Sequence, residues 1–118
     1  MKIKLEEAWA GIAYLIQQSH LAVKEPSKLT PEAISEAAPF NSSIYISVDQ
    51  GWGLSGDVII TRIDPYKVKN DIEFKVEIKW CTTSYSVAGA SAAAKLHLQL
   101  AELGAQIEWY LRTNQISE

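Results

Sequence analysis

Apolar residues recur every three or four positions over residues 4–23, which is the spacing of an amphipathic helix. The repeating positions are Leu5, Ala8, Trp9, Ile12, Ile16 and Val23. Proline disfavours helical geometry in the residue before it, so we expect Glu25-Pro26 to end this helix. Thr30, Pro31 and Glu32 then offer an N-cap, a first-turn proline and a first-turn acid. They predict a short second helix that stops before Pro39.

The pattern changes to strict alternation in the middle of the chain. Residues 44–48 alternate between apolar and polar side chains, which predicts a half-buried strand, and the β-branched run from Val58 to Ile63 predicts a central one. The clearest strand places Ile72, Phe74, Val76, Ile78 and Trp80 on one side and Glu73, Lys75, Glu77 and Lys79 on the other. Residues 42–81 therefore predict a three-stranded antiparallel meander, and its first turn is the glycine-rich loop GWGLSG at 51–56.

Helical spacing returns after a hydroxyl-rich segment at 81–91 and continues to about Arg112. Ser86 and Ser91 both suit an N-cap, and the sequence does not choose between them. One stripe of this helix is Leu96, Leu100, Leu103, Ile107 and Leu111. A second stripe is Ala94, Leu98, Ala101, Ala105 and Trp109. So wide an apolar surface predicts cover on two sides, one from the sheet and one from the first helix or from a second copy of the protein.

These elements predict a single α+β domain over residues 1–118, in the order helix, short helix, three-stranded meander and long C-terminal helix. The helices are expected to pack on one face of the sheet. Tyr45, Ile59 and Ile63 add apolar surface to the first two strands. Because both faces then need cover, we expect a homo-oligomer, most simply a homodimer. We also expect Trp9, Trp80 and Trp109 to be core residues more than Trp52, which lies in the glycine-rich loop.

Composition and charge narrow the class of protein. The formal net charge is −3, and lysines are interleaved with acids, so no basic stripe is present to follow phosphates and nucleic acid is an unfavoured partner. Cys81 is the single cysteine, which suits a reducing compartment. Glu6 and Glu7 stand where a signal peptide would carry basic residues, and no apolar run has the length of a membrane span. We expect a cytoplasmic protein without a membrane partner.

The glycine-rich loop matches G-x-G-x-x-G, but its last glycine leads into a strand rather than the helix that a dinucleotide site requires. Gly51, Gly53, Gly56 and Val58, followed by Val76-Glu77-Ile78-Lys79, are similar to the phosphate-covering loop and lysine strand of protein kinases. That resemblance implies a pairing acid at Glu102 or Glu108. No H-R-D or D-F-G sequence follows, so it leaves nucleotide binding through the Gly51–Gly56 loop as one hypothesis. The other is a hairpin turn that needs glycine.

Asp57 followed by Glu77-x-Lys79, with helices before and after, resembles the core of PD-(D/E)xK nucleases. The resemblance implies that Asp57 and Glu77 hold Mg²⁺ and that Lys79 is catalytic. The competing interpretation is a solvated strand face, because Glu73 and Lys75 continue the same alternation.

The leading hypothesis is a binding protein without catalytic activity or cofactor. The turn at 81–91 combines hydroxyls with a helix start, and Trp52 presents aromatic surface in the preceding loop. We therefore predict that a small molecule or a protein partner is bound by Trp52, Ser84, Tyr85 and Ser86. His20, His97 and Cys81 have no metal-ligand spacing, so no metal site is expected from them.

Overall fold

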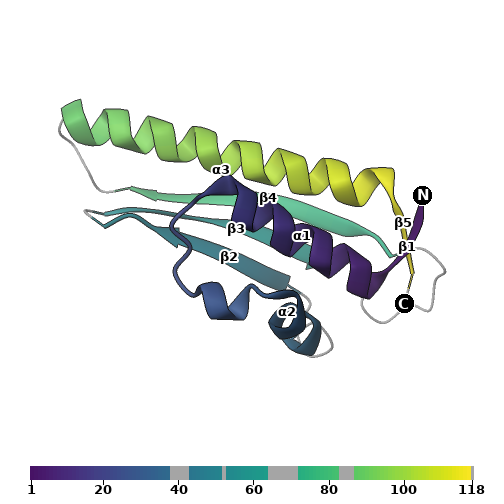
Figure 1. Ribbon diagram of the computed structural model, residues 1–118. Coiled ribbons are helices and arrows are strands. Elements are labelled where there is room, and N and C mark those ends of the chain that lie inside the picture. The colour runs from purple at the N-terminus through teal and green to yellow at the C-terminus, as the bar shows by residue number, and fades with distance from the viewer. Residues whose placement is uncertain (38–42, 52, 64–71, 83–86, 118) are drawn as a thin grey trace.

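The computed structural model describes residues 1–37, 43–51, 53–63, 72–82 and 87–117 of the 118-residue chain. It confirms the predicted α+β architecture, in which a long C-terminal helix packs on a three-stranded antiparallel sheet (Figure 1). The elements in chain order are β1 (Lys2–Lys4), α1 (Leu5–Ser19), the 3-10 turn η1 (Pro26–Lys28), α2 (Pro31–Ala37), β2 (Ser43–Asp49), β3 (Leu54–Arg62), β4 (Phe74–Thr82), α3 (Val87–Thr113) and β5 (Gln115–Ser117).

The sheet has the strand order β2-β3-β4, so β3 is central as predicted. It begins at Leu54, which is four residues earlier than expected, because the turn before it is tighter than the glycine-rich loop suggested. Gly51 and Gly53 both have positive φ, 79° and 74°, and the Leu54 N–H donates to the Gly51 carbonyl at 3.0 Å. Gly56 is consequently a strand residue, facing Val48 on one side and Trp80 on the other.

The core lies between one face of the sheet and the helices. Ile46, Val58 and Ile60 point from the sheet into this core, and α3 runs along β4 above it (Figure 1). The predicted first stripe of α3 is buried throughout: Leu96, Leu100, Leu103, Ile107 and Leu111. Close approach of α3 to the sheet requires glycine at two places, since a Cβ on Gly56 would meet Leu100 and one on Gly104 would meet Ile78. The polar alternation predicted for the third strand is exposed: Glu73, Lys75, Glu77 and Lys79.

The helix ends follow capping chemistry more closely than the proline rule. The first helix ends at Ser19 and not at Glu25, because His20 adopts the left-handed conformation with φ 55° and its N–H donates to the Gln17 carbonyl. The predicted N-cap of α2 is confirmed by the bond from the Ala33 N–H to Thr30 Oγ1 at 3.2 Å. Helix α3 starts at Val87, so Ser91 lies inside the helix and is not its N-cap.

A short parallel pair, β1 with β5, joins the two ends of the described chain and was not predicted. Ile3 and Ile116 are register partners in it, and both are buried. Just after β1, Trp9 packs edge-on against Phe74 at the start of β4. Within the described ranges, no helix is both long enough and apolar enough to cross a bilayer.

Two of the tryptophans expected in the core are exposed. Trp9 is buried, but Trp80 retains 44% of its surface and Trp109 retains 69%. Trp80 lies on the core side of an outer strand, where it stacks against the His97 ring at 3.9 Å between centroids. Trp109 belongs to the second stripe of α3, which points away from the sheet. Helix α3 is covered on two sides as expected, by the sheet and by α1, but no described element covers the second stripe itself.

Candidate functional site

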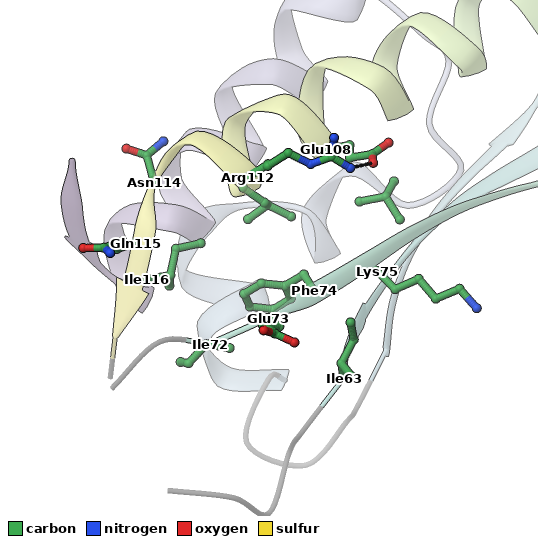
Figure 2. A pocket seen from close by; sticks show the side chains of 12 residues that line it. Ile63, Ile72, Glu73, Phe74, Lys75, Glu108, Arg112, Asn114, Gln115 and Ile116 are labelled. Atoms are coloured by element: carbon green, nitrogen blue, oxygen red, sulfur yellow. Dashed lines mark hydrogen bonds and ion pairs between the residues drawn. The ribbon is translucent and has the colours of Figure 1, made fainter. Parts of the chain in front are cut away.

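A groove opens between the start of β4 and the last turns of α3, with β5 at its end (Figure 2). Its volume is about 530 Å³, and its walls come from segments far apart in the sequence. The apolar lining is Ile63, Ile72, Phe74, Val76, Leu111 and Ile116, and the polar lining is Glu73, Lys75, Glu108, Arg112, Asn114 and Gln115. The groove therefore combines an apolar floor with a charged rim, a composition suited to binding.

The charged rim is partly organised by local pairs. Arg112 and Glu108, one turn apart on α3, form an ion pair above the groove (Figure 2), and Lys75 pairs with Glu77 at 3.3 Å on β4. Asn114 Nδ2 donates to the Tyr110 carbonyl at 2.7 Å, which caps the end of α3 and turns the chain into β5. The groove end is thereby held in place by helix capping as well as by burial of Ile116.

The groove borders the outer edge of β4. Among the described strands, none pairs with this edge. The Ile63 N–H donates to the Glu73 carbonyl at 3.0 Å, so Glu73 directs its backbone groups toward β3. Backbone groups alternate sides along an antiparallel strand, so those of Phe74, Val76, Ile78 and Trp80 point outward. Consistently, the Ile72 N–H points away from β3 and donates to the Ile116 carbonyl at 2.7 Å.

A second groove, of about 480 Å³, lies between α2 and β2. Here the outer edge of the sheet is already used: the Lys24 N–H donates to the Ser47 carbonyl at 2.8 Å, and Val23 bridges to Val48. On β4 no described segment bonds to the outward groups from Phe74 to Trp80, so the groove beside β4 adjoins the longer open stretch of sheet edge.

The predicted ligand-binding residues Trp52, Ser84, Tyr85 and Ser86 lie outside the described residues, and their role stays a prediction. Register pairs Leu54 with Thr82, and Arg62 with Phe74. The described residues next to the predicted site thus lie at one end of β4, and the groove lies at the other end.

Asp57, Glu77 and Lys79, the residues matched to the nuclease family, lie on one face of the sheet. Asp57 is directly opposite Lys79, and Glu77 is opposite Ile59, so the two carboxylates are diagonal neighbours on β3 and β4. This is the face turned away from the helices. In the described part of the chain, no three His, Cys, Asp or Glu side chains form a group that could hold a metal ion.

The glycines of the kinase-like loop have structural roles in the described residues. Gly51 and Gly53 supply positive φ in the turn, and the Gly51 N–H donates to Asp49 Oδ1 at 2.8 Å. Gly56 gives Leu100 room on α3. Hairpin chemistry thus accounts for Gly51 and Gly53, and helix packing for Gly56, while nucleotide binding by this loop stays a prediction.

Tyr110 is a further polar group that joins two elements. Its hydroxyl donates to the Glu7 carbonyl at 3.2 Å, which ties α3 to α1. Partial burial raises the pKa of Tyr110 above its usual value, and the Glu7 carboxylate adds to that rise.

Comparison with protein-family models, with curated proteins and with solved structures gave no match for this chain.

Sequence reasoning missed most of the groove. Arg112 was seen only as the end of a helix, and Ile116 belongs to a strand of three residues. The sequence signal nearest to the groove was the alternation that puts Phe74 and Val76 on one face of β4, but alternation does not identify what packs against them.

Proposed function

We propose that this protein is an interaction module that binds an extended segment of a partner polypeptide along the outer edge of β4. The observation that carries the proposal is the open row of backbone groups at Phe74, Val76, Ile78 and Trp80 beside the groove under α3, in the described part of the chain. An added strand would satisfy these groups with main-chain hydrogen bonds, which is a recurring mode of peptide recognition.

The groove gives this edge side-chain specificity. Residues of a bound strand alternate between the two faces of the sheet, so every second side chain would enter the apolar groove between Phe74 and Leu111. The intervening side chains would lie beside Glu73, Lys75, Glu77 and Lys79 on the polar face. Lysines along an edge disfavour indiscriminate pairing of sheets. That face carries two acids and two lysines, so the partner segment that fits alternates apolar residues with charged residues of both signs.

This proposal is tested with two variants of one edge position. Val76→Pro removes the outward N–H, whereas Val76→Ala shortens the same side chain and keeps the N–H. Proline is tolerated where a strand's N–H faces away from the sheet, so both variants should fold. The probe is a fluorescein-labelled peptide in which valine alternates with glutamate and lysine by turns, with a scrambled peptide as control.

We expect the wild type and Val76→Ala to bind the alternating peptide in fluorescence anisotropy. Val76→Pro should bind about tenfold more weakly, because it loses the hydrogen bond from the N–H of residue 76 to the peptide and the alignment of the peptide that this bond gives. Equal affinity of the two variants, or equal binding of the scrambled peptide, would contradict edge pairing.

A metal-dependent nuclease is the second candidate function, favoured by the shared face of Asp57 and Glu77. Two carboxylates on neighbouring strands suit a hard divalent cation. If this is the function, Mn²⁺ should broaden the amide resonances of Asp57 and Glu77 selectively, and Asp57→Asn should abolish both broadening and Mg²⁺-dependent nicking of plasmid DNA. Uniform spectra throughout a Mn²⁺ titration would remove this candidate.

A further inference from the structure

The outward side of α3 carries an apolar stripe that no described element covers. Its two large side chains, Leu98 and Trp109, retain 61% and 69% of their surface. The stripe continues through small residues, at steps of alternately three and four positions: Ser91, Ala94, Leu98, Ala101 and Ala105. That spacing is the seam of a coiled coil, in which a helix packs against another helix.

We propose that the α3 stripe pairs with the same stripe of a second copy of this chain, with the two helices antiparallel. In a two-fold antiparallel pair, the numbers of facing residues add to a constant. With the axis between Gln99 and Leu100, Leu98 faces the partner's Ala101, and Ala94 faces the partner's Ala105. A large side chain then meets a small one on each side of the axis, and the alanines allow the helices to approach closely.

The same register pairs charges. Lys95 and Glu102 are both exposed on one flank of the stripe, two turns apart, so they are too far apart to pair within one helix. Across the antiparallel seam, Lys95 is offset from the partner's Glu102 by two residues, about 3 Å along the axis, a distance that the two long side chains span, and Glu102 is placed in the same way to the partner's Lys95. Because the axis is two-fold, this contact occurs twice and the dimer has two equivalent ion pairs.

The other flank of the stripe is already occupied within the chain. Gly104 approaches Val76 and Ile78, and His97 stacks on Trp80. The flank that carries Lys95 and Glu102 is the one exposed to a neighbour. A two-fold axis brings Lys95 of each copy toward Glu102 of the other, so this flank is complementary in charge to itself. For this reason we choose a second copy of the chain over an unrelated helix.

The predicted dimer is reversible. One pair of helix faces buries less than the roughly 1,200–2,000 Å² of stable complexes, so a dissociation constant in the micromolar range is expected. The interface adjoins the groove beside β4 at Glu108, which faces the partner's Ser91 in this register, but the inference rests on the α3 stripe and not on the proposed peptide site.

The test uses sedimentation velocity over a concentration series of the full chain. Leu98→Glu should leave a folded monomer at every concentration, because the position is exposed in the single chain; far-UV circular dichroism checks the fold. Lys95→Glu and Glu102→Lys each place like charges across the seam, and each alone should weaken the dimer about tenfold.

Mixing these two charge variants gives the decisive result. The glutamate introduced at position 95 of one variant then faces the lysine introduced at position 102 of the other. The native Glu102 of the first variant faces the native Lys95 of the second, so both pairs are opposite in charge and the mixture should form a heterodimer with near wild-type affinity.

Several outcomes would overturn the proposal. They are a wild type that stays monomeric, a Leu98→Glu variant that still dimerises, or charge variants that do not combine on mixing. Association of α3 with a different protein in place of the second copy would overturn it as well.

Discussion

Replacement of Trp9 by alanine is expected to lower the free energy of unfolding by about 3–5 kcal/mol. Trp9 is 4% exposed, and its ring packs edge-on against Phe74 with centroids 5.5 Å apart and an interplanar angle of 76°. The contact joins α1 to the first residue of β4, so truncation leaves a cavity between two elements. Urea unfolding followed by far-UV circular dichroism measures the loss.

Trp109→Ala is the matched control, since it removes the same side chain from an exposed site. We expect its free energy of unfolding to stay within about 0.5 kcal/mol of the wild type at concentrations where the chain is monomeric. A similar loss in both variants would mean that Trp109 is covered in the single chain, contrary to its 69% exposure.

These two tryptophans show the limit of pattern reasoning. Both recur at helical spacing with apolar neighbours, and both were therefore predicted to be core residues. Periodicity identifies which residues share a face of a helix, but it does not say which of two apolar faces meets the sheet. Leu96 and Leu100 turn inward because large side chains fill the space above the sheet, and the alanine-rich face is left outside.

The fold was predictable because its elements are long and strongly patterned. Alternation from Ile72 to Trp80 and the regularly spaced leucines of α3 each specify one structure over many residues. The ends of the helices and strands were less predictable, because each depends on the conformation of one or two residues. His20 ends α1 in a left-handed conformation that the sequence does not predict. Gly53 has a positive φ and makes the turn shorter than the six-residue loop at 51–56 that the sequence predicted.

The groove was less predictable because it is assembled from distant pieces. Phe74, Arg112 and Ile116 come together only when α3 lies along β4 and β5 folds back beside β1. Three-residue strands carry too little pattern to be recognised. The sequence also left open whether Asp57 and Glu77 come together, and it is the observed register that places them as diagonal neighbours on one sheet face.

The seating of α3 on the sheet depends on Gly56, and Gly56→Ala is expected to cost about 1–3 kcal/mol by overpacking. An ideal Cβ at this position would lie 2.5 Å from Leu100 Cδ1 and 2.9 Å from the Lys79 carbonyl oxygen. Leu100→Ala alone should cost about 2–5 kcal/mol, because Leu100 is fully buried. The double variant should lose about 1 kcal/mol less than the sum, since the shortened side chain no longer meets the new methyl group.

The rescue should be incomplete, because the Lys79 carbonyl belongs to the backbone and remains close to residue 56. Gly51→Ala combined with Leu100→Ala is the control pair. A Cβ at Gly51 meets nothing within 4 Å, so its cost comes only from the positive φ and should add to that of Leu100→Ala. Additivity in both pairs, measured by chemical denaturation, would show that Leu100 does not fill the space above Gly56 and that another contact fixes the distance between α3 and β3.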